Sequence, residues 1–422
     1  MNPISITLLV LLGATILFVW EKVPLAVTAL AATAVLAVTK VLTPKEAFSG
    51  FSDSNVILFG AMFIVGGALF ETGMAHRIGG LVTRFAKSER QLIVAIMTVT
   101  GLLSGVLSNT GTAAILMPVV IGVAAKSGFS RSRLLMPLVF AAAMGGNITL
   151  IGAPGNMIAD SALRHMGNGD GFTFFEFAKI GLPMLFVGIL YFVLVGYKLL
   201  PNRVNKDSTA HTDDFSNVPE WRKTMSLGVM LLTVAGMVFE KEIGIPLYVT
   251  GVVGAIVLVA ARVVTEKQAY ASIDLGTIFL FAGMLPVAIA LDKTGAGKTI
   301  ATAVIGVLGD KPSPTLVLVV LFGISCTLTQ FMSNTATTAL LAPIAVSISQ
   351  AIGADPHAVL MAIVIGGSCA YATPIGMPAN TMVYGPGGFK FLDYTKAGLP
   401  LIIVSFIVSV ILLPMFWPFF PG

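Results

Sequence analysis

The amino-acid sequence repeats itself over nearly its whole length, and this repetition limits the chain to two related halves. The clearest match is a polar tripeptide, Ser-Asn-Thr, which opens the run SNTGTAAILMPV at Ser108 and the run SNTATTALLAPI at Ser333. In both places small residues, a helix-forming run and a proline follow the tripeptide. Two such runs rarely arise by chance, so we expect the rest of the chain to be organised around them.

Other matches place the two copies at an offset of about 220 residues. The run IGAPGN from Ile151, for example, answers to IGMPAN from Ile375. The copies are residues 1–200 and 224–422, and the polar segment 201–223 is the expected cytoplasmic linker between them.

Apolar segments recur from end to end. Of the 422 residues 56% are apolar and 11% are charged, whereas about a quarter of the residues in a soluble domain are charged. Runs of about 17 to 25 apolar residues match the thickness of a hydrocarbon core. We therefore expect an all-α polytopic membrane protein with five transmembrane helices per copy, the first three at 4–20, 24–42 and 54–71. The first run has no basic lead-in and no A-x-A-like cleavage site, which favours a retained helix over a signal peptide.

Four further segments predict interrupted helices. Segments 92–125 and 314–352 each carry one tripeptide, and in the first of them each arm has only about 15 residues, or about 22 Å of helix. This length is too short to cross, so we expect re-entrant helical hairpins with the tripeptide at the tip. Segments 134–163 and 357–383 contain glycine and proline breaks, which predict discontinuous helices. The charged stretch 77–90 is expected to lie along the membrane interface.

An odd number of crossings makes the second copy enter the membrane upside down relative to the first, giving two inverted-topology repeats. The lysines and arginines favour a cytoplasmic linker, because most of the 25 basic residues then lie on the cytoplasmic side. Both termini are then expected outside. The first hairpin would enter from the cytoplasm and the second from outside.

The tripeptides have the chemistry of a combined anion and cation site. Irregular backbone at membrane depth survives only where it is buried in protein or lines a cavity, so two hairpin tips and two broken helices predict a polar site near the midplane. Helix N-termini favour an anion. Neutral Ser, Thr and Asn oxygens suit Na+, by analogy with other hard cations. The simpler alternative is that Ser108, Asn109, Ser333 and Asn334 only cap the helices that follow them.

Few other side chains are of a type and in a pattern that would indicate binding or catalysis. Thr149 and Thr373 align within the breaks, where packing between helices is the alternative to binding. Cys326 and Cys369 stand in apolar segments without metal or redox spacing, so we expect buried free thiols. The run GAGKT from Gly295 lacks the first glycine and the preceding strand of a phosphate loop. No HExxH or GxSxG pattern occurs, so we expect no enzyme.

Carboxylates and histidines are informative by their scarcity. Glu71, Asp160, Asp274 and Asp292 lie near the ends of predicted segments and form no cluster within the membrane, which argues against a proton relay. The four histidines fall in loops or interfaces and are expected to be solvated; they are His76, His165, His211 and His357.

The paired SNT tripeptides, the breaks GGNITLIGAPGN and YATPIGMPAN, and the run MVYGPGGFKF resemble the divalent anion/sodium symporter family, within the wider ion transporter superfamily. The resemblance covers almost the whole chain. It implies an elevator-type carrier, in which a scaffold holds still while a transport domain of hairpins and broken helices moves the site across the membrane. It also implies a homodimer, no organic cofactor and a place in the bacterial inner membrane.

By matching position, the resemblance implies two Na+ sites and one anion site. The first Na+ would be held by Ser104, Ser108, Asn109 and the backbone near Ile148. The second would be held by Thr329, the Met332 backbone, Asn334 and the backbone near Ala372. The anion would lie among Asn109, Thr110, Asn334, Thr335 and Thr373, with Ser108 and Ser333 beside it.

The expected function is Na+-coupled symport of a small divalent anion, with C4-dicarboxylates such as succinate, malate and fumarate as the first choice. Two departures concern the substrate: APGN and MPAN stand where dicarboxylate members often carry a TPPN-like run, and YGPGG is more similar to branches assigned to sulfate. The alternatives are a sulfate or other oxyanion symporter and a Na+-independent dicarboxylate exchanger. A proton-coupled or metalloid-oxyanion carrier comes next, followed by an ion channel. No nucleic-acid partner is expected.

Overall fold

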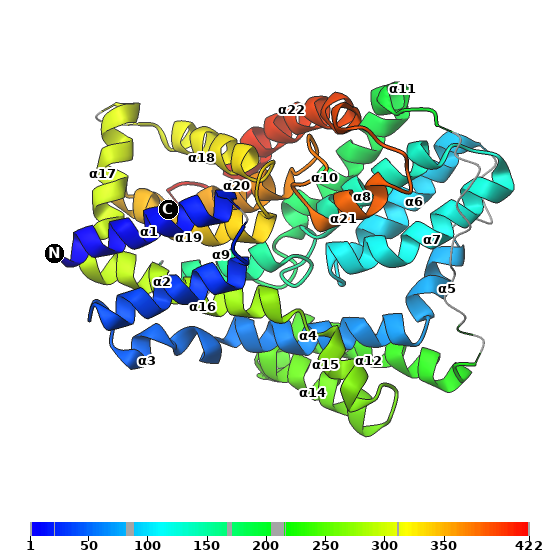
Figure 1. The fold of residues 1–422 in the computed structure, drawn as a ribbon, viewed down its shortest axis with the longest axis horizontal. Coiled ribbons are helices and arrows are strands. Elements are labelled where there is room, and N and C mark those ends of the chain that lie inside the picture. Colours follow the sequence, from blue (N-terminus) through cyan, green and yellow to red (C-terminus); the bar gives the residue numbers. More distant parts are fainter. Residues whose placement is uncertain are drawn as a thin grey trace.

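The computed structural model describes residues 2–20, 22–81, 88–166, 171–203, 215, 217–309 and 312–420, and these residues form helices and turns without a strand. The expected all-α class is confirmed (Figure 1). The first half contains α1 (Pro3–Trp20), α2 (Leu25–Val38), α3 (Pro44–Ala47), η1 (Ser49–Ser52), α4 (Ser54–Glu71), α5 (Met74–Leu81), α6 (Glu89–Ser104), α7 (Asn109–Ser127), α8 (Arg131–Gly145), α9 (Pro154–Met166), α10 (Ala178–Tyr191), the π-helical η3 (Phe192–Gly196) and α11 (Tyr197–Leu199). The second half contains α12 (Glu220–Val238), α13 (Glu240–Ile243), α14 (Leu247–Ala260), α15 (Glu266–Ser272), α16 (Leu275–Thr294), α17 (Ala296–Leu308), α18 (Pro314–Leu328), α19 (Asn334–Ala351), α20 (His357–Ser368), α21 (Pro378–Tyr384) and α22 (Phe391–Phe416).

Among the described residues, five helical segments are long and apolar enough to cross a membrane. They are α1, α4, the continuous segment Ala178–Leu199, α16 and α22. Five crossings in each copy therefore require other helices to span in pieces or at reduced length. The apolar helices α2 and α14 have 14 residues each, about 21 Å of helix, and the broken segments are divided into shorter helices.

The order of helices in the first half recurs in the second, and so does their packing. Helix α6 packs on α8 as α18 packs on α20. Contacts between the halves are also paired, because α9 packs on α19 while α21 packs on α7, and α2 packs on α16 while α4 packs on α14. In Figure 1, α4, α12, α14 and α15 form one side of the molecule, and α8, α10, α18, α20 and α22 lie on the other side.

The helices are interrupted at the glycine and proline runs and at the two tripeptides. The helices of segment 92–125 are α6 and α7, which reach slightly beyond it and turn at residues 105–108. Segment 314–352 contains α18 and α19, with a turn at 329–333. In segments 134–163 and 357–383, eight residues separate α8 from α9 and nine separate α20 from α21.

Two polar segments differ from their expected boundaries. Helix α12 begins at Glu220, so the last residues of the expected linker 201–223 are helical, because Pro219 presets the first turn and a glutamate follows it. The stretch 77–90 begins within α5, which ends at Leu81, and ends within α6, which begins at Glu89; its interfacial placement stays a prediction, because residues 82–87 lie outside the described part of the chain.

Helices α2 and α16 cross so closely that a glycine is required between them. A Cβ at Gly283 would stand 2.8 Å from the Ala29 carbonyl carbon and 2.9 Å from the Leu30 nitrogen. The Thr33 hydroxyl donates to the Gly283 carbonyl oxygen at 2.5 Å, across the same crossing. This contact joins the two halves of the chain beside the cavity described below.

We expect Gly283→Ala to lower the melting temperature of the detergent-solubilised protein by several degrees. The added methyl group meets backbone atoms that cannot rotate aside, and overpacking of this kind costs about 1–3 kcal/mol. Thermal unfolding followed by tryptophan fluorescence measures the effect. Gly228→Ala in α12 is the control, because nothing lies within 4 Å of its added Cβ. Equal melting temperatures for the two variants would contradict the tight crossing.

Candidate functional site

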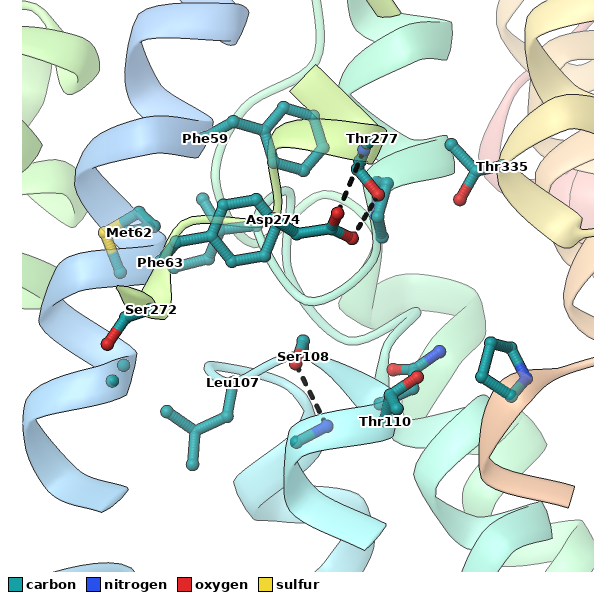
Figure 2. A pocket seen from close by; sticks show the side chains of 18 of the residues that line it. Phe59, Met62, Phe63, Leu107, Ser108, Thr110, Ser272, Asp274, Thr277 and Thr335 are labelled. Carbon is teal, nitrogen blue, oxygen red and sulfur yellow. Dashed lines mark hydrogen bonds between the residues drawn. The ribbon is translucent and has the colours of Figure 1, made fainter. Parts of the chain in front are cut away.

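Both SNT tripeptides line one cavity of about 680 Å³, which lies between them and helices α4 and α16. Figure 2 shows Ser108, Thr110, Thr335 and Asp274 around this space, with Phe59 and Phe63 of α4 on one wall. The candidate site residues that line the cavity are Ser108, Asn109, Thr110, Ser333, Asn334 and Thr335. Residues more than 200 positions apart in the sequence are therefore brought together.

The first tripeptide forms the N-terminus of α7. The Ser108 hydroxyl accepts a hydrogen bond from the Gly111 amide at 3.1 Å, so the expected capping role is present (Figure 2). Asn109 is buried at 5% exposure. One atom of its amide lies 2.8 Å from Ser104 Oγ, 3.1 Å from the Ala142 carbonyl oxygen and 3.3 Å from the Gly152 carbonyl oxygen, and as a nitrogen it would donate to all three.

The second tripeptide repeats the cap but not the asparagine contact. The Ser333 hydroxyl accepts from the Ala336 amide at 3.2 Å. The Asn334 side-chain oxygen instead accepts from the Thr335 amide at 2.9 Å, one residue further on. The two asparagines therefore stand in different surroundings although the tripeptides have the same sequence.

Beneath the tripeptides, hydroxyl groups tie each hairpin to the neighbouring broken helix. Ser104 donates to the Ala142 carbonyl oxygen at 2.7 Å, and Thr329, at the matching place, donates to the Gly367 carbonyl oxygen at 2.5 Å. Both hydroxyl groups are completely buried. These two expected cation ligands lie under the cavity and do not line it.

Each break also contains a threonine, and the two threonines make corresponding hydrogen bonds. Thr149 donates to the Gly105 carbonyl oxygen, and Thr373 donates to the Gln330 carbonyl oxygen at 2.7 Å. Thr373 also accepts from the Gly376 amide at 3.1 Å and does not line the cavity, so its hydroxyl serves the shape of the break. The placement of Thr373 beside the anion therefore stays a prediction, and in this conformation its hydroxyl is engaged within the break.

The three expected backbone contributors are buried around the same breaks. Ile148 packs against Gly105, where an added Cβ would stand 3.2 Å from the Ile148 Cβ. Met332 is fully buried in the turn before α19. The Ala372 amide donates to Gln330 Oε1 at 3.0 Å, and its carbonyl accepts from the Thr395 hydroxyl at 3.0 Å.

One asparagine in each break pairs with the freed carbonyl groups. Asn156 Nδ2 donates to the carbonyl oxygens of Gly146 and Thr149 at 2.8 and 2.7 Å. Asn380 Nδ2 donates to those of Ala370 and Thr373 at 2.7 and 3.1 Å. Backbone carbonyls without a partner would be costly at this depth, so these asparagines allow the breaks to persist. The sequence runs APGN and MPAN contain them, but their spacing alone did not indicate this role.

Sequence reasoning missed two acidic side chains in the cavity wall. Glu71, at the end of α4, and Asp274, just before α16, both line the cavity, although we expected them at segment ends without a common site. Asp274 accepts from the Thr277 amide at 3.1 Å and from the Thr277 hydroxyl at 2.6 Å (Figure 2). No Lys or Arg is found among the described lining residues.

Other titratable groups also differ from their expected surroundings. Asp160, expected near the end of a segment, is completely buried within α9 and accepts from Arg164 Nε at 2.7 Å. His165 is exposed, as expected, and also contacts the Asp53 carboxylate, whereas His357 is half-buried against the Asp355 carboxylate. The sequence gave no signal for Asp53, which is more than 100 residues from His165, whereas Asp355 is only two residues from His357.

The two cysteines are free and buried, as expected. Among the described residues, no group of three or more His, Cys, Asp or Glu side chains is arranged to hold a metal ion. The oxygen-bearing groups around Asn109 and Thr329 are therefore the strongest candidates for a cation in this part of the chain, and the N-termini of α7 and α19 are the strongest for an anion.

Comparison with known proteins agrees with this geometry. The family model described as "Citrate transporter" matches residues 15–366, which is most of the chain. An uncharacterized transporter of Escherichia coli (strain K12), YfbS, is 27% identical over 99% of this chain and 100% of its own length. The sodium-dependent dicarboxylate transporter SdcS of Staphylococcus aureus (strain MRSA252) is 23% identical over 96% of this chain and 84% of its own length.

Two solved structures have a similar fold. The YdaH transporter of Alcanivorax borkumensis, described as having an unusual topology, superposes with a TM-score of 0.67 at 16% identity, over 97% of this chain and 100% of that one. MtrF of Neisseria gonorrhoeae, described as illuminating a class of antimetabolite efflux pumps, superposes with a TM-score of 0.64 at 15% identity, over 99% and 95%. The family match over most of the chain, together with these folds, shows that this integral membrane protein belongs to the citrate transporter family and is a transporter rather than an enzyme.

Proposed function

We propose that the protein is a Na+-coupled symporter of a small divalent anion, with C4-dicarboxylates such as succinate, malate and fumarate as substrates. The observation that carries this proposal is the meeting of the two SNT turns in one cavity, each at the N-terminus of a long helix. The name of the Staphylococcus aureus relative, a sodium-dependent dicarboxylate transporter, supports the choice of ion and substrate.

Helix N-termini supply the positive potential that a divalent anion needs. Residues in the first turns of α7, α9 and α19 line the cavity. Each N-terminus carries the equivalent of about half a positive charge, so three of them favour an anion beside the SNT turns, away from the carboxylates of Glu71 and Asp274 in the same cavity wall. A cavity of about 680 Å³ also lies within the usual size range for small-molecule sites.

The surroundings of Asn109 support one Na+ site. The inner atom of its amide faces Ser104 Oγ and the carbonyl oxygens of Ala142 and Gly152 at 2.8 to 3.3 Å. As a nitrogen this atom donates hydrogen bonds, but as an oxygen it completes a set of four oxygen ligands. Hard cations bind neutral oxygens of this kind, so Na+ entry would turn the amide and replace its hydrogen bonds.

The second Na+ site would lie at the matching place in the other copy. Thr329 Oγ1 and the Gly367 carbonyl oxygen are 2.5 Å apart, and Gly367 lies next to Asn334, where an added Cβ would stand 3.7 Å from the Asn334 carbonyl oxygen. Asn334 would have to release the Thr335 amide to turn its side chain inward.

The proposed mechanism is an elevator motion of the hairpins and broken helices against the helices that include α4 and α16. It follows from the resemblance together with the position of the cavity, which has SNT turns on one wall and α4 and α16 on the other. The inverted orientation of the two copies in the membrane and the homodimer belong to the same proposal.

Uptake of radiolabelled succinate into proteoliposomes tests the function directly. We expect uptake to require an inward Na+ gradient and to be blocked by excess malate or fumarate. Uptake that ignores Na+ but needs internal dicarboxylate would identify an exchanger. Sulfate uptake without succinate uptake would identify the oxyanion alternative, and uptake driven only by a proton gradient would overturn Na+ coupling.

We expect Asn109→Ala and Asn334→Ala each to lower uptake at least tenfold, because each removes a side chain that lines the cavity at a helix N-terminus. Monodisperse elution in detergent and an unchanged helical circular dichroism signal would show that the variants fold. Asn202→Ala, at an exposed position, serves as the control. Near-normal uptake in both cavity variants would rule out the proposed site.

Ser104→Ala and Thr329→Val remove one proposed Na+ ligand each while keeping most of the side-chain volume. We expect the Na+ concentration for half-maximal uptake to rise several-fold, with a smaller change in the anion KM at saturating Na+. Thr302→Val is the matched control, since its hydroxyl only donates to the Lys298 carbonyl oxygen within an exposed turn of α17. Unchanged Na+ dependence in both variants would contradict the ligand assignment.

A further inference from the structure

A buried polar network joins the start of α4 to the middle and end of α9. Asn55 Nδ2 donates to Asp160 Oδ2 and to Ser161 Oγ, both at 2.8 Å. Ser161 Oγ donates to Asp53 Oδ1 at 3.2 Å, and His165 Nε2 contacts Asp53 Oδ2 at 3.0 Å. Three side chains of α9 are thus held by two residues at one end of α4.

Four of the five side chains in the network have little access to water, whereas His165 at its edge is 42% exposed. Asp160 and Ser161 are completely buried, and Asn55 and Asp53 are 5% and 8% exposed. Asp160 is also bound by Arg164 Nε at 2.7 Å and by the Phe172 amide at 2.6 Å. A buried polar group that loses its partner is costly, so this contact tends to be either fully made or fully opened to water.

The network lies beyond the end of the cavity opposite Glu71. Helix α4 lines the cavity from Phe59 to Glu71, and its start at Asp53 and Asn55 lies beyond the cavity. Helix α9 lines it with Pro154 and Met157 and is tied by the network from Asp160 onward. Figure 1 shows α9 between the two sides of the molecule described above. Helix α9 also packs against α19, which carries the second SNT tripeptide.

In the second copy, the corresponding aspartate is not docked on a broken helix. Asp274 stands before α16 as Asp53 stands before α4, and both carboxylates cap their own helices. Asp274 accepts only from Thr277 among its hydrogen bonds in the described residues, and it lines the cavity. One capping aspartate is therefore docked on a broken helix while its counterpart faces the cavity.

We propose that the network of Asp53, Asn55, Asp160, Ser161 and His165 is a latch that keeps one side of the carrier closed. It rests on the proposed function, because an elevator motion of α9 and α19 past α4 has to separate these residues in every cycle. The cavity is open toward Glu71 and Asp274 while the latch is made, and the latch parts when the site moves to the other side of the membrane.

Cross-linking tests whether the latch must open during transport. In a Cys326→Ala/Cys369→Ala background, Asn55→Cys with Ser161→Cys places two thiols where the side chains now touch, and Hg2+ can bridge them. We expect Hg2+ to lower anion uptake at least tenfold and dithiothreitol to restore it. Each single cysteine variant should keep most of its uptake. Loss of maleimide labelling after denaturation shows that the bridge has formed.

A matched control uses the other end of α4. The Thr72 and Ser226 hydroxyls are 2.9 Å apart and buried, and they join α4 to α12 on the same side of the molecule. We expect a Hg2+ bridge in Thr72→Cys/Ser226→Cys to leave uptake nearly unchanged, because these helices move together. Normal uptake with a complete bridge at residues 55 and 161 would overturn the latch.

A second measurement does not depend on the transported anion. Ser161→Cys in the same background places a fully buried thiol in the latch, and its rate of maleimide labelling in membranes reports opening. We expect Asn55→Ala to raise this rate at least fivefold, whereas Thr72→Ala leaves it unchanged. An unchanged rate with Asn55→Ala would overturn the latch even if uptake is normal. Absence of uptake in the cysteine-free parent, with faster labelling, would instead count against the proposed symport alone.

Discussion

The structure depends on hydrogen-bond partners for the backbone groups that are left free where the helices are interrupted. Four interruptions of helices lie around one cavity. Lipid provides no hydrogen-bond partner for the amides and carbonyls that such interruptions leave free. Short side chains fill this need: Asn156 and Asn380 bind the carbonyls of the two breaks, while Ser108 and Ser333 cap the helices after the two turns. The same interruptions expose helix N-termini, so the groups that make the fold possible also create a polar site.

The repeat gives the protein two copies of several polar residues, and the two copies have different surroundings in the structure. Asn109 faces oxygens of the broken helix, whereas Asn334 binds its own turn. Asp53 is docked on α9, whereas Asp274 faces the cavity. Two copies with identical roles could not be open on one side and closed on the other at once. Unequal surroundings for equal residues are therefore what we expect of a carrier held in one of two states.

Much of the site could be predicted from the sequence because its residues lie in a repeated, local pattern. A serine before a helix caps that helix, and a glycine and proline run breaks one, without regard to the rest of the chain. Contacts over long distances could not be predicted in this way. Nothing near Asp160 or His165 in the sequence indicates that α4 supplies Asn55 and Asp53, and nothing near Asp274 indicates that it faces the tripeptides.

The sequence by itself determined the membrane class, the two copies, the turns at the tripeptides and the polar chemistry of their side chains, because hydropathy, repetition and capping act locally. Only the tertiary structure decided which groups share the cavity and which carboxylates are buried. These properties depend on the packing of helices from both halves, such as α2 on α16 and α9 on α19. Since burial and charge pairing arise from that packing, Asp53 and Asp274 acquire opposite surroundings from the same local position.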